Sequence, residues 1–505
     1  MGEGSNAVSA ARGVSYLWLQ IIVSTVARIV AFAFFARLIS VGQMGVFTIL
    51  SVGSSAASGI MGLGLSSVVT KFVAENIAQG KKEEAASVYY KSILLSELAS
   101  VIVAVGFLLS NFPAAVSHLP NSPLISAIGI LFAIDVVANI GPIATAVFYG
   151  LLKFRDSALI YMVYSSVRPF MVVLFVYETG SLIGLVEAWV ISDIVLAVCM
   201  FAYLGRKLGP PVFRFSTKYL LRLSIPLCLA NLASFVYGSF DQLTLIPLVS
   251  LTALGVYGAA VTAFTAYNSL LNIFGSVLLP VFAGVYGVKG PEGLKDSIRT
   301  ASRYGSIVAM PLAFALLATA RPALTLFVGG SYQGGIIPLA VLALGSIATI
   351  VALSLGPVLV VLNETTLAAI VSVLSIPLSV AVALVSIPML GILGASIARA
   401  LSMLLNLFLL WAFVRRQVVV KLDFQAILKS VVAGGGMALV MEALQLFYYS
   451  RFLLPVYLLV GFFAYLLGMR ALKAMGKADI DLLRRMIGPH FARICDLLSR
   501  LVLSP

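Results

Sequence analysis

The sequence predicts an all-α polytopic membrane protein of about 14 transmembrane helices, built as two six-helix pseudo-symmetric lobes plus two C-terminal helices. Three observations lead to this fold class. The 505 residues are 61% hydrophobic and only 10% charged, whereas soluble domains carry about 25% charged residues. Apolar runs long enough to cross a bilayer, roughly 20 residues each, recur along the whole chain. A repeated hairpin motif divides these runs into two halves.

The hydropathy pattern predicts fourteen spans. The first six cover about 14–36, 45–69, 88–110, 123–150, 158–177 and 182–204. The next six cover about 223–249, 252–283, 304–327, 336–361, 366–388 and 391–414, and the last two 427–449 and 452–470. The first run is too long for a signal-peptide core and has no clear cleavage site, so we expect it to be retained as a helix.

Basic residues fall mostly in alternate polar gaps between the spans. With the N-terminus placed in the cytoplasm, 27 of the 33 Lys and Arg residues lie in cytoplasmic segments, including all 13 lysines. This positive-inside bias predicts a multi-pass protein of the cell membrane with both termini in the cytoplasm. The net charge of +14 then indicates loops that face anionic lipid headgroups rather than nucleic acid. Of the six remaining arginines, Arg37, Arg321 and Arg451 lie at outer helix ends, where we expect interface anchors.

An internal repeat appears at an offset of 210 residues. Residues 38–47 read LISVGQMGVF, and residues 248–257 read LVSLTALGVY. Each stretch joins an outgoing span to a returning one, at spans 1–2 and 7–8. The coincidence of the matches with equivalent hairpins favours duplication, and therefore two lobes in parallel repeat.

The repeat and the loops predict the domain organisation. We expect a cytoplasmic N-terminus (1–13), an N-lobe of helices 1–6 (14–205), a basic cytoplasmic inter-lobe linker (206–222), a C-lobe of helices 7–12 (223–414), helices 13–14 (415–470) and a cytoplasmic tail (471–505). From residue 480 the tail places apolar residues at helical spacing with arginines between them, which predicts an amphipathic helix on the inner leaflet.

Three arginines lie inside predicted spans: Arg28 near the middle of span 1, Arg168 in span 5 and Arg399 in span 12. Each would cost about 2.5–3.5 kcal/mol at the lipid-facing centre of a helix, so we expect all three to face the bundle interior. Acidic residues inside spans are candidates to pair with them: Glu97, Asp135, Glu187, Asp193 and Asp241.

Enzyme chemistry finds no support in the sequence. A Gly-rich phosphate loop, an H-E-x-x-H zinc motif and a C-x-x-C pair are all missing, and the chain has only two histidines, His118 and His490. We therefore expect neither a catalytic site nor a metal site, and no resident cofactor.

Four segments carry a family resemblance. ARLISVGQMGVFTIL (36–50), GLGLSSVVTKFVAENIAQGKKEEA (62–85), the stretch 224–260 and MLGILGASIARALS (389–402) resemble, in this order, segments of polysaccharide and lipid-linked oligosaccharide flippases. These flippases belong to the multidrug/oligosaccharidyl-lipid/polysaccharide (MOP) exporter superfamily. The resemblance extends from residue 14 to about 415, and it implies a two-lobed, V-shaped alternating-access fold of 12 to 14 helices.

The resemblance also implies a function: flipping of a polyprenyl-(pyro)phosphate-linked oligosaccharide from the inner to the outer leaflet, for cell-surface polysaccharide or glycan assembly. Members of the family handle such lipids through basic, water-filled cavities, and Arg28 resembles them in its placement. A glycan polymerase or transferase would be a natural partner. In this interpretation Arg28, Arg168 and Arg399 bind the headgroup phosphate; in the alternative one, an arginine pairs with Asp135 or Asp241 and ties helices together.

The acids leave two interpretations open. Asp241, about eight residues before the outer end of span 7, either couples transport to H⁺ or Na⁺ or pairs with an arginine across the lobes. Asp135, Asp193 and Glu187 are further candidates for ion coupling. The membrane potential alone could also drive the outward movement of an anion.

Two other functions compete with the flippase. A cation-coupled multidrug exporter of the sister family should have an acidic or aromatic cavity, and three arginines within spans argue against it. A membrane scaffold or an embedded glycosyl polymerase is the other alternative. A polymerase would need a large external loop, and the longest outer loop, near 110–122, is too short.

Overall fold

The computed structural model describes residues 3–109 and 122–474, and this part of the chain is built from helices and contains no strand. Thirteen helical segments in it are long and apolar enough to span a membrane. One of them, α11, is two helices joined at Gly290, which has non-helical φ and ψ of 61° and −155°. The predicted fold class of about 14 transmembrane helices is confirmed. The predicted amphipathic tail lies outside the described residues, which end at residue 474.

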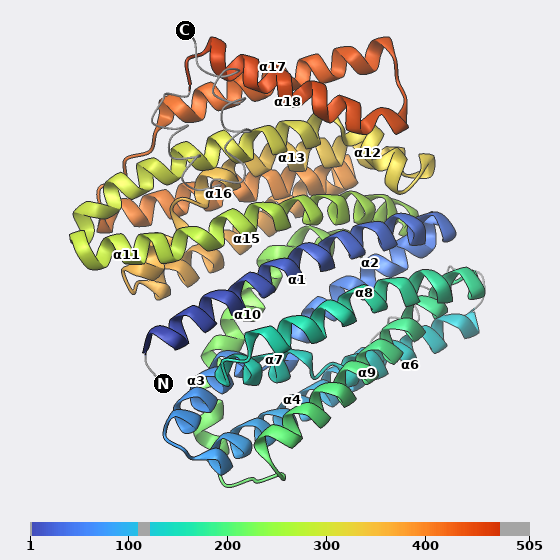
Figure 1. Ribbon diagram of the computed structural model, residues 1–505. Coiled ribbons are helices and arrows are strands. Elements are labelled where there is room, and N and C mark those ends of the chain that lie inside the picture. Colours follow the sequence, from blue (N-terminus) through green and yellow to red (C-terminus); the bar gives the residue numbers. More distant parts are fainter. Residues whose placement is uncertain (1–2, 110–121, 475–505) are drawn as a thin grey trace. The chain divides into compact units, whose positions relative to one another are not determined.

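The chain divides into two compact units, Met1–Gly258 and Ala259–Pro505. Unit 1 contains α1 (Glu3–Leu38), α2 (Val41–Met61), α3 (Leu65–Ala78), α4 (Lys82–Leu109), α6 (Ser122–Ala138), α7 (Gly141–Gly150), α8 (Phe154–Thr179), α9 (Leu182–Leu208), α10 (Thr217–Leu245) and the start of α11 (Leu251–Ala318). Within this unit α1 lies along α8, as Figure 1 shows, and α9 packs against α6 and α8.

Unit 2 contains the remainder of α11 and the helices that follow it. These are α12 (Ala320–Phe327), η1 (Gly330–Gly335), α13 (Ile336–Ala352), α14 (Gly356–Val361), α15 (Thr365–Leu390), α16 (Ile392–Gln417), α17 (Phe424–Phe447), η2 (Arg451–Leu453) and α18 (Leu454–Ala471). The last two long helices, α17 and α18, lie side by side (Figure 1). Their buried Met441 and Tyr457 share a core with Phe314 of α11, so the two C-terminal helices are packed into unit 2.

Two of the predicted spans are each divided into two helices at a proline. The fourth span divides into α6 and α7, and the tenth into α13 and α14. In both cases the second helix is short and begins with a Gly-Pro pair, at Pro142 in α7 and Pro357 in α14. Proline fits the first turn of a helix because the amide hydrogen that it lacks has no acceptor there. Other prolines, such as Pro169 and Pro226, lie inside continuous helices.

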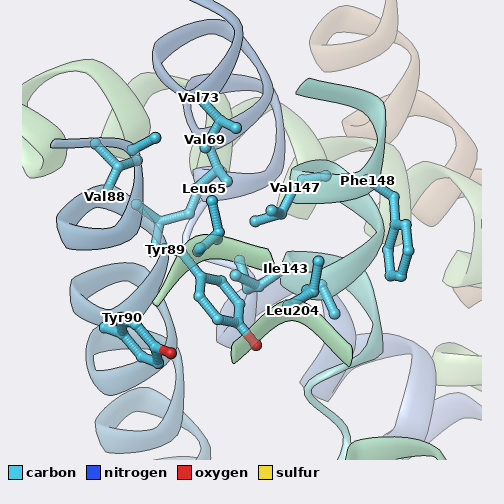
Figure 2. Packing of buried hydrophobic residues seen from close by; sticks show 14 of the residues in the cluster. Leu65, Val69, Val73, Val88, Tyr89, Tyr90, Ile143, Val147, Phe148 and Leu204 are labelled. Atoms are coloured by element: carbon cyan, nitrogen blue, oxygen red, sulfur yellow. The ribbon is translucent and has the colours of Figure 1, made fainter. Parts of the chain in front are cut away.

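The core of unit 1 is formed by α3, α4, α7 and α9. Figure 2 shows Val69 and Val73 of α3 on one side of this core and Ile143 and Val147 of α7 opposite them. Tyr89 of α4 is fully buried in the same cluster. Lipid tails are as apolar as these side chains, so tight packing rather than release from water stabilises such a core within a membrane.

The segment between α9 and α10 is held against α3 and α4. Ser87 Oγ accepts a hydrogen bond from Phe215 N (2.8 Å), and Lys91 Nζ donates to the carbonyl oxygen of Phe215. Tyr90 donates its hydroxyl hydrogen to the carbonyl oxygen of Gly209 (2.8 Å). This segment lies in the predicted inter-lobe linker (206–222), yet the compact units divide 36 residues later, after Gly258. The linker therefore belongs to unit 1, together with α10; the lobe boundaries themselves stay a prediction.

The two repeated hairpins begin their second helices in the same way. Ser40 caps α2, with its Oγ accepting a hydrogen bond from Gln43 N (3.2 Å). Ser250, 210 residues later, accepts one from Ala253 N (3.3 Å). Each helix starts at the residue after its serine. A serine at this position satisfies an amide hydrogen that the helix itself leaves without a partner. The repeated sequence thus forms repeated local structure.

These two helix starts cross at close range inside unit 1. A Cβ atom added to Gly45 would lie 2.1 Å from the carbonyl oxygen of Leu251, and one added to Gly255 would lie 2.1 Å from that of Val41. The two glycines are 210 residues apart, as are Val41 and Leu251, so the contact is symmetric with respect to the repeat. Small residues allow helix backbones to approach in this way in membranes, where close packing drives helix association.

Gly45→Ala should lower the melting temperature of the protein in detergent, because the new Cβ atom has no room beside Leu251. Overpacking of this kind costs about 1–3 kcal/mol. Gly59→Ala, in the same helix, is the matched control, since a Cβ atom at Gly59 meets nothing within 4 Å. Equal melting temperatures for the two variants would show that the contact at Gly45 does not constrain the fold.

Candidate functional site

Arg168 of α8 lies between two carboxylates of neighbouring helices. Its Nη1 is 3.1 Å from Oδ1 of Asp193 on α9, and its Nη2 is 3.8 Å from Oδ1 of Asp135 on α6. Both acids are buried, and a quarter of the arginine side chain is exposed. Three residues that the sequence analysis chose separately thus meet at one place. With both acids ionised, this cluster carries one negative charge more than it has positive charges.

Two aromatic residues complete the cluster. Tyr164 accepts a hydrogen bond from Arg168 Nη1 and donates its own hydroxyl hydrogen to Asp193 Oδ1. The guanidinium carbon lies 5.1 Å from the ring centroid of Trp189, within cation–π range. Neither residue was predicted from the sequence. Their spacing could have revealed them, because Tyr164 precedes Arg168 by four residues and Trp189 precedes Asp193 by four.

The position of Arg28 differs from that of Arg168. In α1 it occupies the same helical face as Ser24, four residues before it, and Phe35, seven residues after it. Both of these neighbours are buried, yet Arg28 itself is exposed. Its Nε donates a hydrogen bond to the carbonyl oxygen of Ser24 (3.3 Å), within its own helix. Arg28 thus has an uncovered side chain on the face of α1 that also carries the buried Ser24 and Phe35.

The other candidate residues lie apart from the Arg168 cluster. Arg399 lies half-buried on α16 of unit 2. Asp241 of α10 is fully buried, and Tyr257 at the start of α11 donates a hydrogen bond to its Oδ2 (2.5 Å). Glu187 is half-buried on α9, six residues before Asp193. Ion coupling at these acids and phosphate binding at the three arginines stay predictions.

Two of the arginines expected at the outer helix ends stack on aromatic rings. The guanidinium carbon of Arg321 lies 4.2 Å from the ring centroid of Tyr449, and that of Arg451 lies 5.0 Å from the ring centroid of Phe452. Arginine and tyrosine are both suited to the membrane interface, because each joins an apolar body to a polar tip. These contacts agree with an anchoring role. Among the described residues, no group of three or more His, Cys, Asp or Glu side chains comes together as a metal site.

Comparison with known proteins finds one matching family and several similar structures. A family model described as polysaccharide biosynthesis protein matches residues 34–336, more than half of the chain. No curated protein sequence matches the chain. The structure is similar to that of the lipid II flippase MurJ in an inward closed conformation, with a TM-score of 0.72 and 14% identity over 93% of this chain and 99% of that one.

Two further solved structures are similar over about four fifths of the chain. One is an inward-facing multidrug resistance MATE transporter of the MOP superfamily, with a TM-score of 0.63, 17% identity and coverage of 78% of this chain and 94% of that one. The other is a MOP superfamily transporter from Pyrococcus furiosus, with a TM-score of 0.57, 17% identity and coverage of 81% and 95%. At these identities the similarity shows a shared fold, the one expected from the sequence.

Asp193→Asn should destabilise the protein by about 3 kcal/mol, because it removes the nearest negative charge from a mostly buried guanidinium. This is the lower end of the range for a broken buried ion pair, since the amide oxygen still accepts a hydrogen bond. Thermal unfolding in detergent measures the loss. Glu187→Gln on the same helix is the control, because Glu187 makes no ion pair among the residues that the structure describes. Equal stability of the two variants would contradict a structural role for the cluster.

Proposed function

This chain belongs to the polysaccharide biosynthesis protein family, and from that premise we propose that it is a flippase for a lipid-linked oligosaccharide. It moves a polyprenyl-(pyro)phosphate-linked glycan from the inner to the outer leaflet, where the glycan enters cell-surface polysaccharide or glycan assembly. Both termini lie in the cytoplasm, as the distribution of lysine and arginine predicts. The protein acts as a transporter of the cell membrane and not as an enzyme.

The observation that carries this proposal is the exposed side chain of Arg28 inside a predicted span. A cation in a membrane-spanning helix is costly, and one that keeps open space on a packed face is placed to receive an anion. Arginine suits a phosphate because its planar fork matches two phosphate oxygens at once. Arg28 is therefore the first contact of the headgroup phosphate. Arg168 and Arg399 are secondary candidates, and Arg168 would have to share its charge with Asp135 and Asp193.

The physical task is to lower a solvation barrier. An anionic headgroup transferred alone into hydrocarbon would lose tens of kcal/mol of hydration by Born estimates, so unassisted flipping is slow. Guanidinium groups in a wet cavity replace part of that hydration, while the polyprenyl tail remains in the lipid. With the cell interior negative, outward movement of the anion is downhill by about 2.3 kcal/mol per charge per 100 mV. The potential can therefore drive transport, with H⁺ or Na⁺ as the coupling ion if a gradient is also used.

The Arg168 cluster favours a second candidate, a cation-coupled exporter of the sister multidrug family. Its two carboxylates outnumber its single guanidinium, which leaves a site where a proton or a sodium ion would be held favourably. The two functions differ in cargo charge. A flippase of this kind binds an anionic lipid and an exporter binds soluble cations. A glycan polymerase or glycosyltransferase that uses the flipped lipid is the expected partner of the first function only.

Arg28→Ala and Arg28→Lys should both abolish flipping of a polyprenyl-diphosphate-linked oligosaccharide in proteoliposomes, while the variants still fold and insert. Lysine keeps the charge but cannot bind two phosphate oxygens in a plane. Flipping is followed by the access of an added glycosidase to the sugar in the outer leaflet. Arg451→Ala, at a helix end and stacked on Phe452, is the control and should retain activity. Normal flipping by the alanine variant at position 28 would remove the central support for the proposal.

A further inference from the structure

A continuous row of aromatic rings crosses three helices of unit 1. Phe47 of α2 contacts Phe32 of α1 with a centroid distance of 6.1 Å, and it contacts Phe35 of the same helix at 5.0 Å. On its other side Phe47 contacts Trp189 of α9 at 6.1 Å. All these pairs are tilted, a geometry that aromatic rings favour over face-to-face stacking.

An arginine contacts one end of the row, and a second arginine lies one helical turn from the other end. Arg28 precedes Phe32 by four residues, so both lie on the same face of α1. At the other end the guanidinium carbon of Arg168 lies 5.1 Å from the ring centroid of Trp189. Rings from helices far apart in the sequence therefore lie between Arg168 and the helical face of Arg28, the arginines of the predicted spans 5 and 1.

The rings are not equally covered. Phe35 is buried with 2% of its surface exposed, as a core ring should be. Phe32, Phe47 and Trp189 are only partly buried and keep some surface open. Phe34 of α1 is uncovered much further, at 58%. The three partly covered rings thus lie between these two extremes, and each keeps some surface that a ligand could contact.

We propose that Phe32, Phe47 and Trp189 form a stacking subsite for the pyranose rings of the cargo, next to the phosphate contact at Arg28. This inference rests on the proposed flippase function and adds the part of the site that receives the glycan. A pyranose ring presents a face of C–H groups that carry partial positive charge, and an aromatic ring presents a negative face. Stacking recognises that shared face rather than the pattern of hydroxyl groups. The subsite therefore distinguishes a glycosylated lipid from a bare one, and accepts different pyranoses.

The test compares two soluble probes, farnesyl diphosphate and farnesyl diphosphate linked to a β-1,4-linked N-acetylglucosamine disaccharide. Both carry the same diphosphate, so only the second reports on the sugar subsite. We expect the native protein to bind the glycosylated probe about tenfold more tightly, a free-energy difference that two or three stacked rings can supply. Dissociation constants measured by thermophoresis in detergent give the ratio. Trp189→Leu and Phe47→Leu should each bring this ratio close to one and leave the affinity for farnesyl diphosphate within about twofold.

Two control variants separate stacking from packing. Trp189→Phe keeps an aromatic face and should retain most of the preference for the glycosylated probe. Phe35→Leu changes a ring of the same row that is only 2% exposed. It should leave the ratio of the two dissociation constants unchanged. Arg28→Ala should lower the affinity for both probes by the same factor, because both carry the same diphosphate.

The outcomes that overturn the inference are distinct from failure of the proposed function. Equal binding of the two probes by the native protein removes the sugar subsite but leaves a phosphate site. Loss of preference in Phe35→Leu, or an equal loss of affinity for both probes in Trp189→Leu, shows that the rings serve packing alone. If the native protein binds neither probe, the assignment of an anionic lipid cargo fails, and the subsite fails with it.

Discussion

The structure depends on how charges are compensated where no bulk water reaches them. A guanidinium within a helix bundle must find an anion, a water-filled space or a ligand, because hydrocarbon offers none of these. Arg168 finds two carboxylates, and the contacts to Asp135 and Asp193 join α8 to α6 and α9. Tyr164 links the arginine to Asp193 a second time through its hydroxyl group. The neutralisation of one cation thus links three helices of unit 1.

Arg28 must also be compensated within the membrane-spanning bundle, but no carboxylate lies beside it among the ion pairs of the described residues. It lies on the packed face of α1 but remains exposed, and the hydrogen bond it makes is to its own helix. A compensated arginine stabilises the bundle, whereas an exposed one remains available to a ligand. The row of rings from Phe32 through Phe47 to Trp189 lies between these two arginines. A lipid-linked glycan combines the chemistries that such an arrangement offers, since its phosphate is an anion and its sugars have apolar faces.

Close contact between two helix backbones is the second constraint on the packing of unit 1. Gly45 and Gly255 allow the starts of α2 and α11 to cross with no side chain between them. The residues that make this contact are equivalent in the two sequence repeats, and so are the serines that cap both helices. The linker docked on Ser87 and Lys91 keeps the start of α10 with the same unit. The repeat seen in the sequence is therefore matched by equivalent caps and contacts in the local structure.

The fold class, the approximate spans and the repeat could be predicted from the sequence, because each follows from a local pattern: apolar runs of bilayer length, basic gaps and a hairpin repeated after 210 residues. The sequence also identified Arg168, Asp135 and Asp193 as costly residues that need partners. That these three residues meet is seen only in the folded chain, since 25 and 33 residues separate the arginine from Asp193 and Asp135 and no local rule fixes that register. The roles of Trp189 and Phe47 likewise depended on which helix faces meet. Distances across a bundle are set by packing, and a linear pattern of hydrophobicity does not contain them.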